Sequence, residues 1–388
     1  MDNRICNRGR QGIIFVIEFE YIESQLGIFF VKFYYLGAMI SNPKMITLGR
    51  ESRGLTQKEL ANLLNITQGS MSKLEQGVLH ANEDMLSLLG RELKYPPSFF
   101  TQKGDILPEN FLYRKKVSLS GTMLKRQSSY MAICRLMVQR MISTSFVPLR
   151  RFPVIQVTEE VSPRDIANAV REQLDIPKGP ILNLIEVVEK SGIIVIGIDL
   201  DTDKVAGKGI ITEGIPIIYY NINLPADRQR FTIAHEFGHI VMHLNVFPDG
   251  DTQVEMEANK FASEFLMPAA QIRQDLSVPL NLSSLGALKK KWKVSMSSLI
   301  IRAKDLGIMS DREFTFFMSR FSQWGYKMRE PAQFDFLPEE TSLYEEMIER
   351  FAKYKGVEII DVPKLFYLDQ KEFFEKYGGN YRMKYMIN

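Results

Sequence analysis

Three of the four histidines in this chain of 388 residues lie close together, at His235, His239 and His243. The first two frame the sequence His-Glu-Phe-Gly-His. Residues four positions apart share one face of an α-helix, so both imidazoles can reach a single metal ion. Glu236 follows the first histidine, where a carboxylate can take a proton from a water that zinc has made acidic. The spacing therefore predicts a hydrolytic zinc site with His235 and His239 as ligands and Glu236 as general base; a chance match is rare, on the order of a few in a thousand.

The third protein ligand must come from elsewhere, since a catalytic zinc needs three ligands and an open fourth position. His243 lies about 12 Å beyond His235 along a helix axis, so we expect a partly buried polar residue at the helix end, where a cation suits the helix dipole. Glu255 and Glu257 point about 200° apart on the next helical segment, so only one of them can face the ion. We predict Glu255, because Asn259 lies one turn later and could hydrogen-bond a ligating histidine.

Residues 55–77 carry a second pattern, two short helices joined by a tight turn. Thr56 and Glu59 form a capping box before a predicted helix over 57–64, and a second helix is predicted over 68–76. The second helix would present polar side chains and exposed backbone to the edges of DNA bases, at Gln68, Gly69, Ser70, Ser72 and Lys73. Gln57 could contact a phosphate or brace Gln68. The alternative is a helical adaptor that binds no DNA.

Charge sets limits on DNA binding. Residues 45–100 carry equal numbers of basic and acidic side chains, so counterion release would contribute little to affinity. A homodimer, or the basic segment that follows, would have to strengthen binding. Residues 111–157 hold no acidic side chain and nine basic ones: Arg114, Lys115, Lys116, Lys125, Arg126, Arg135, Arg140, Arg150 and Arg151. A solvated linker explains that segment equally well.

The overall composition is that of an ordinary globular protein. The chain has 49 basic and 46 acidic residues, a formal charge of +3, 45% hydrophobic and 24% charged residues. These values exclude a disordered chain, a collagen-like fibre and a strongly basic nucleic-acid binder. Cys6 and Cys134 are too far apart in sequence for a metal knuckle or a disulfide framework, so a reducing, cytoplasmic location is expected.

The pattern of elements divides the chain into five segments. They are an extension (1–44), a helix-turn-helix domain (45–100), a basic helical connector (101–157), a metallopeptidase core (158–280) and a helical C-terminal region (281–388). Helices are predicted over 163–174, 181–190, 225–244 and 252–266, and strands over 192–197 and 215–221. Beyond residue 285 the chain is predicted to be mostly helical, with breaks at Gly307, Gly325 and Pro331.

The first 44 residues contain two apolar runs, over 13–17 and 27–35. Glu18 and Glu20 interrupt them, so neither reaches the roughly 20 residues that a membrane span requires, and no membrane partner is expected. The simplest interpretation is two strands. A targeting segment is a second interpretation, and a natural start at Met39 or Met45 is a third.

The sequence around both motifs resembles known families. Phe-Thr-Ile-Ala-His-Glu-Phe-Gly-His (231–239), followed by Glu-Met-Glu-Ala-Asn-Lys-Phe-Ala (255–262), is similar to the ImmA/IrrE family of zinc metallopeptidases, and the similarity extends roughly from residue 163 to the end. Residues 55–77 resemble the Xre/Cro-like helix-turn-helix. The first resemblance implies a gluzincin-like site and cleavage of a protein, typically a DNA-binding repressor. It also suggests that the strand over 215–221 is the edge to which an extended substrate adds.

These observations lead to one expected architecture and function. The fold is expected to be mainly α with a small β-sheet: an all-α helix-turn-helix domain, an α+β gluzincin-like domain and a helical C-terminal region. The function is expected to be a regulator that binds a double-stranded DNA operator and uses Zn²⁺ to cleave a repressor, in a stress response or a mobile element. The alternatives are a non-catalytic transcription factor with a structural or sensing metal site, and an antitoxin-like binding protein.

Overall fold

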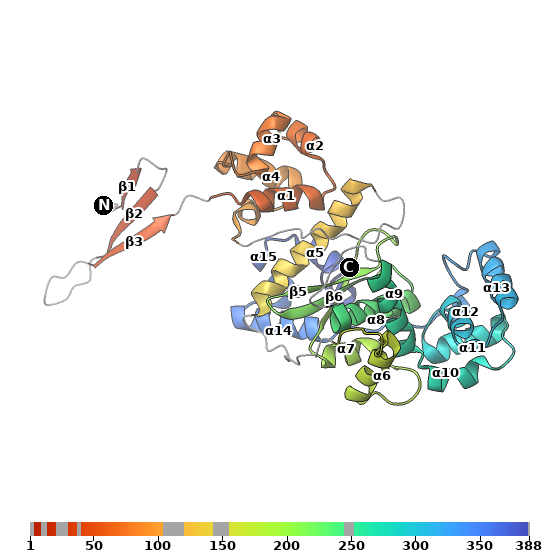
Figure 1. The fold of residues 1–388 in the computed structure, drawn as a ribbon. Coiled ribbons are helices and arrows are strands. Elements are labelled where there is room, and N and C mark those ends of the chain that lie inside the picture. Colours follow the sequence, from red (N-terminus) through yellow and green to blue (C-terminus); the bar gives the residue numbers. More distant parts are fainter. Residues whose placement is uncertain are drawn as a thin grey trace. The chain divides into compact units, whose positions relative to one another are not determined.

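The computed structural model describes residues 4–8, 14–20, 30–36, 40–103, 120–142, 155–243 and 252–386. The chain divides into two compact units, Met1–Leu107 and Pro108–Asn388 (Figure 1). No helix within the described ranges has the length and apolar character needed to cross a lipid bilayer.

The first unit begins with three strands and continues with short helices. The strands form an antiparallel sheet in the order β1-β2-β3, where two strands were predicted: β1 (Arg4–Arg8), β2 (Ile14–Glu20) and β3 (Phe30–Leu36). The helices are α1 (Pro43–Ser52), α2 (Gln57–Leu63), α3 (Gln68–Glu75) and α4 (Glu83–Leu93), followed by the 3₁₀ turn η1 (Pro97–Thr101). Thr56 and Glu59 form the predicted capping box, and Thr67 caps α3. Apolar side chains from α1 to η1 fill the core, among them Met45, Leu60, Leu74, Leu89 and Phe99.

The second unit is built on a three-stranded sheet. Its strands are β4 (Ile194–Ile198), β5 (Gly207–Thr212) and β6 (Ile215–Asn221), in the order β4-β6-β5. β6 pairs in parallel with β4 and antiparallel with β5. The prediction for β6 is confirmed, whereas β4 lies slightly later than predicted and β5 was not predicted at all. The turn between β5 and β6, Glu213-Gly214, has positive φ at both residues, as a two-residue hairpin requires.

Helices cover both faces of this sheet. Because side chains alternate along a strand, Ile218 and Tyr220 of β6 join one core with Ile233 and Phe237, while Tyr219 points the other way. On that opposite face Tyr219 lies near Cys134 and Tyr344. These two residues belong to α5 (Gly121–Ile142) and α14 (Leu343–Lys355). The side chains on the two faces of β6 therefore belong to two separate cores.

The face that carries Ile218 is covered by four helices close to their predicted positions. They are α6 (Pro163–Gln173), α7 (Leu184–Lys190), α8 (Ala226–His243) and α9 (Thr252–Leu266). α8 packs on β5 and β6, and α9 packs on α8. The remaining helices are α10 (Ala269–Leu276), α11 (Leu282–Trp292), α12 (Met296–Asp305), α13 (Asp311–Gln323), α15 (Val362–Leu365), α16 (Gln370–Lys376) and α17 (Tyr381–Met386). The mainly helical fold with an α+β domain is as predicted.

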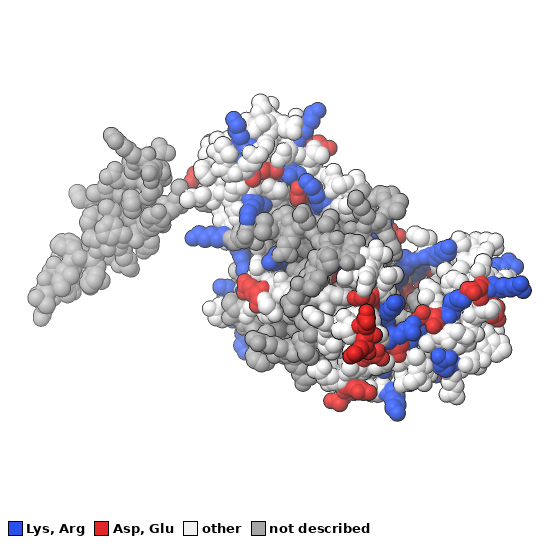
Figure 2. All heavy atoms as spheres, in the orientation of Figure 1, with Lys and Arg blue, Asp and Glu red and all other residues white. Residues whose placement is uncertain are grey.

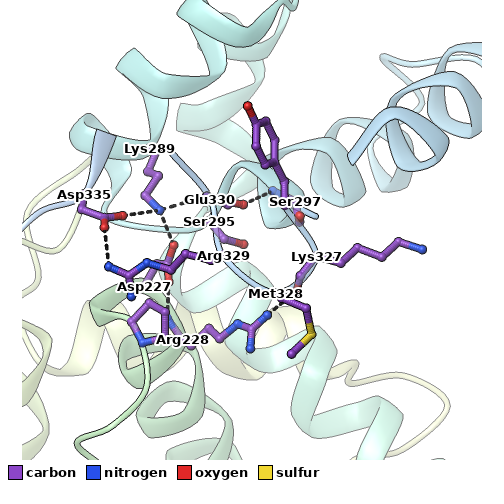
Figure 3. Close-up of a pocket in the computed structure, with 12 residues that line it drawn as sticks. Asp227, Arg228, Lys289, Ser295, Ser297, Lys327, Met328, Arg329, Glu330 and Asp335 are labelled. Atoms are coloured by element: carbon purple, nitrogen blue, oxygen red, sulfur yellow. Dashed lines mark hydrogen bonds and ion pairs between the residues drawn. The ribbon is translucent and has the colours of Figure 1, made fainter. Parts of the chain in front are cut away.

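A buried ion cluster anchors the first turn of α8 (Figure 3). Lys289 of α11 is 1% exposed, and its Nζ lies 2.6 Å from Asp227 Oδ2, 2.9 Å from Glu330 Oε2 and 3.2 Å from Asp335 Oδ1. Glu330 also accepts hydrogen bonds from the backbone N–H groups of Met296 and Ser297, the first residues of α12. A small cavity of about 90 Å³ lies beside the cluster. The cluster therefore joins α8, α11 and α12 through one ammonium group.

Two further carboxylates join α7 to the segment before α14. Glu339 accepts hydrogen bonds from the N–H groups of Leu184 and Ile185, at the start of α7. At the other end of α7, Glu189 accepts hydrogen bonds from Ser342 and Leu343. Burial raises the pKa of Glu189 to about 7, although these hydrogen bonds oppose the shift. Residues 339–343 are thus fixed to both ends of α7.

Candidate metal centre and helix-turn-helix surface

The histidines of α8 line one buried face of that helix. His235, His239 and His243 are 5%, 8% and 6% exposed, and the ring of Phe231 stacks on His235 at 6.5 Å between centroids. Beside these histidines, α8 packs against α9 through the rings of Phe237, Phe261 and Phe265. Gly238 is essential to this approach, because a Cβ at that position would lie only 2.8 Å from the ring of Phe261. The close packing brings the first turn of α9 toward the histidines.

Three of the predicted site residues come together at one point. The Nε2 atoms of His235 and His239 are 3.0 Å apart. Glu255 places Oε1 at 3.4 Å from His239 Nε2 and Oε2 at 3.6 Å from His235 Nε2. Ligand atoms held tetrahedrally at about 2.0–2.1 Å from a zinc ion lie roughly 3.3 Å from one another. The two nitrogens and one carboxylate therefore have the chemistry and spacing of a zinc ligand set.

Glu257 lies on the same helix but takes a different partner. Its Oε2 is 2.9 Å from His243 Nε2, and its Oε1 accepts a hydrogen bond of 3.0 Å from Gln253. His243 lies at the end of α8 as expected and is buried; burial lowers its pKa, and the bond to Glu257 opposes this shift. Within the described part of the chain no hydrogen bond joins Asn259 to His235 or His239; His243 lies against His239 instead, at 3.2 Å between their Nδ1 atoms.

Glu236 faces β5 rather than the three ligand atoms. Its Oε2 accepts a hydrogen bond of 2.8 Å from the backbone N–H of Gly209. A Cβ at Gly209 would lie 3.3 Å from that same oxygen, and a Cβ at Gly207 would lie 2.3 Å from a backbone oxygen of β6 and 2.7 Å from Thr232. The two glycines thus let α8 and its carboxylate lie close against β5.

The expectation that residues 215–221 form the substrate-side edge is wrong. β6 is the central strand, because β4 pairs along one side of it and β5 along the other. Local apolar patterns identify strands but do not reveal their order in a sheet. The strand that lies at the edge beside Glu236 is β5, and the signal that could have revealed it is the Glu213-Gly214 hairpin turn.

In the first unit, the residues predicted to contact bases lie on α3, mostly at the surface. Gln68, Gly69 and Lys73 are exposed, and Ser70 and Ser72 are half-buried. Ser70 pairs with the capping residue Thr67, and Ser72 accepts a hydrogen bond from Gln76. Their polar atoms are therefore placed along one short helix.

Gln57 does not brace Gln68, which was one of the two interactions expected of it. Its Nε2 donates to Glu75 Oε2 at 2.7 Å. The carboxylate of Glu75 also binds the buried side chain of Arg50, at 2.6 Å from Nε. Gln57 thus belongs to a network that joins α1, α2 and α3.

On the face of α1–α4 that Figure 2 shows, basic side chains form no continuous positive surface. In the part of Figure 2 that corresponds to α1–α4, Lys and Arg are separated from one another, in keeping with the balanced charge of this segment. On α5, Arg126 pairs with Asp201, and Arg140 donates to the backbone oxygen of Leu365. Lys115 and Lys116 lie outside the described residues.

Two segments of the chain match known protein families. Residues 48–100 match the family model described as helix-turn-helix, and residues 188–304 match that of the IrrE N-terminal-like domain, an M78 peptidase family. No curated protein matches the chain. The chain thus has the architecture of a DNA-binding, helix-turn-helix transcription regulator joined to an ImmA/IrrE-like domain of metallopeptidase type.

Proposed function

We propose that the second unit is a zinc-dependent endopeptidase that cleaves a repressor protein, and that the helix-turn-helix brings this activity to a DNA operator. The observation that carries the proposal is the convergence of His235, His239 and Glu255 on one point, with Glu236 on the same helix beside a sheet edge. A structural zinc site has no need of that fourth residue.

His235 Nε2, His239 Nε2 and one oxygen of Glu255 would hold the ion, since their separations of 3.0, 3.4 and 3.6 Å fit tetrahedral zinc. Bound there, zinc would acidify a water molecule and polarise the carbonyl of the scissile peptide bond. Glu236 would take the proton from that water and pass it to the leaving amine. The N–H of Gly209 holds one oxygen of Glu236, which leaves the other for proton transfer.

The edge of β5 offers a place for an extended peptide. Ala206 accepts a hydrogen bond from Asn221 and so faces β6. Because backbone polar groups alternate in direction along an antiparallel strand, those of Lys208, Ile210 and Thr212 face β6 too. Those of Gly207, Gly209 and Ile211 face the edge that no strand among the described residues covers. A substrate strand would add along the remaining backbone groups of these three residues, since the N–H of Gly209 already donates to Glu236, and this contact places the strand next to Glu236.

The decisive experiment combines metal analysis with proteolysis. The zinc-loaded chain is incubated with the repressor encoded at the neighbouring locus, and cleavage is followed by mass spectrometry. Glu236→Gln should lower the cleavage rate by roughly 10²–10⁴-fold, as expected when a general base is removed. Its zinc content and operator binding should remain those of the wild type. Cleavage at the wild-type rate would show that the metal site is structural, and the chain would then be a non-catalytic regulator.

DNA recognition can be tested separately. Gln68→Ala should relax sequence preference, because exposed Gln68 opens the helix proposed to meet base edges. Neutralising Lys115 and Lys116 should instead weaken binding to all sequences and reduce its dependence on salt. If footprinting with the wild-type protein finds no protected site, the helix-turn-helix is an adaptor.

A further inference from the structure

The third histidine of α8 is buried, and the proposed chemistry does not use it. His243 lies one turn beyond His239, with 3.2 Å between their Nδ1 atoms. Its Nε2 lies 2.9 Å from Glu257 Oε2, and the side chains of His243 and Glu257 are 7% and 13% exposed. A continuous line of polar contacts therefore runs from His239 through His243 to Glu257, on the side of His239 away from His235.

The positions of the protons along this line follow from the donors and acceptors. If Nε2 of His239 holds a metal, the proton of that ring is on Nδ1, which must then donate. The Nδ1 atom of His243 accepts this hydrogen bond, so the proton of the second ring is on Nε2. That proton is donated to Glu257, whose other oxygen is held by Gln253 at 3.0 Å. Each hydrogen bond along this line therefore has one donor and one acceptor, and all of them run from His239 toward Glu257.

We propose that His243 and Glu257 are a positioning pair, which fixes the ring angle and the proton of His239 so that its Nε2 lone pair faces Glu255 and His235. The proposal rests on the metal site proposed above and adds to it. It also gives each acidic residue at the start of α9 a distinct role, because Glu255 approaches the ligand nitrogens directly and Glu257 acts through His243. His243 itself does not touch the ion.

The first test is the affinity for Zn²⁺, measured on the full chain by competition with a chromophoric chelator. His243→Phe keeps an aromatic ring but removes the acceptor, and it should weaken Zn²⁺ binding by about 10–100-fold, the usual effect of losing a partner of a ligating histidine. Thr232→Val is the matched control on α8, because its buried hydroxyl donates only to the backbone oxygen of Arg228. This control should bind Zn²⁺ as the wild type does.

Variants at Glu257 cover the case in which His243→Phe does not fold. Glu257→Gln keeps an oxygen that can accept from His243, so its affinity should stay within a few-fold of the wild type. Glu257→Leu removes the acceptor and should weaken Zn²⁺ binding as much as His243→Phe does. The double variant should be no weaker than either single one, because both break the same line of contacts.

A second readout observes the proton itself. In the zinc-loaded wild type, ¹H–¹⁵N spectra of the histidine rings should show His239 protonated at Nδ1, with slow exchange of that proton, and His243→Phe should exchange it faster. Unchanged affinity and unchanged spectra in His243→Phe and Glu257→Leu would overturn the proposal. If His239→Ala still loses the metal in that case, the metal site stands; if His239→Ala also retains full affinity, the proposed function fails with it.

Discussion

The first turn and the interior of α8 contact buried polar groups of opposite kinds. At the first turn, Lys289 lies between Asp227, Glu330 and Asp335, so each charge faces an opposite charge. Two turns later, His235 and His239 direct their nitrogens at one point, with a carboxylate beside them. In the first group every carboxylate contacts the same ammonium group, and these contacts hold helices together. The second presents three electron-pair donors to a common centre, which is the arrangement that a cation requires.

The strongest test of this difference is removal of a ligand. His235→Ala and His239→Ala should each reduce bound zinc from about one per chain to almost none, because two remaining ligands hold the ion poorly. The metal-free variants should unfold within about 1 kcal/mol of the metal-free wild type, since neither histidine holds an ion pair of the Lys289 kind. Zinc analysis checks the loss of the metal, and urea unfolding checks the stability of the metal-free variants. Retention of zinc in both variants would contradict the metal centre.

At the first turn of α8 we expect a loss of stability without a loss of zinc. Lys289→Met should destabilise the fold by about 3–5 kcal/mol, because it leaves buried carboxylates without their cation. Zinc affinity of the folded fraction should not change. Lys290→Met, at the exposed neighbouring position, is the control and should have little effect on unfolding. If both lysine variants unfold at the same urea concentration, the cluster contributes little to stability.

A smaller effect should separate the proposed base, Glu236, from the proposed ligands. In Gly209→Ala the new Cβ would lie 3.3 Å from Glu236 Oε2 and must displace it. Turnover of the substrate protein should fall roughly tenfold, with zinc binding unchanged, because only the base moves. Gly121→Ala is the control, since its Cβ would have no neighbour within 4 Å. Loss of zinc in Gly209→Ala would mean that β5 supports the ligands as well.

The smallest effect concerns a third buried group, Glu189, whose carboxylate accepts hydrogen bonds from Ser342 and Leu343. Burial raises its pKa to about 7, so the folded state binds the proton more tightly than the unfolded state does. Its contribution to stability is therefore complete below about pH 4.5 and is lost as the pH rises toward 7. The loss should be roughly 1–3 kcal/mol. Urea unfolding from pH 5 to 8 should show this fall in stability with rising pH in the wild type and in Glu186→Gln, but not in Glu189→Gln. The same fall in all three proteins would assign it to another group.

Sequence reasoning succeeds where the determining residues are neighbours in the chain. The spacing of His235 and His239 identifies α8, and the capping box at Thr56 identifies the start of α2 to the residue. Helix geometry favours Glu255 over Glu257, and the structure places Glu255 beside both histidines, although its role as a ligand stays a prediction.

Failures come from relations between distant segments. Lys289 is 62 residues from Asp227 and 41 from Glu330, so no local pattern links them. The glycines of β5, which let α8 approach, also remove the apolar alternation by which strands are recognised, and the wrong edge strand follows from that omission. The sequence places His243 at the end of α8, but its contacts with Glu257 and His239 join residues that no local pattern connects, so they were not predicted.

Two helices that cover the sheet lie outside the family match in sequence: α5 precedes residues 188–304, and α14 follows them. This order has a consequence for synthesis of the chain. On the ribosome, α8 and α9 emerge before α14, so the face of the sheet that α14 covers lacks this helix while α8 and α9 are already present. The fold can close only when residues 339–355 have emerged to meet α7 and α5. A fragment limited to residues 188–304 should therefore aggregate when expressed alone, and a truncation after α13 should be degraded as an unfinished domain.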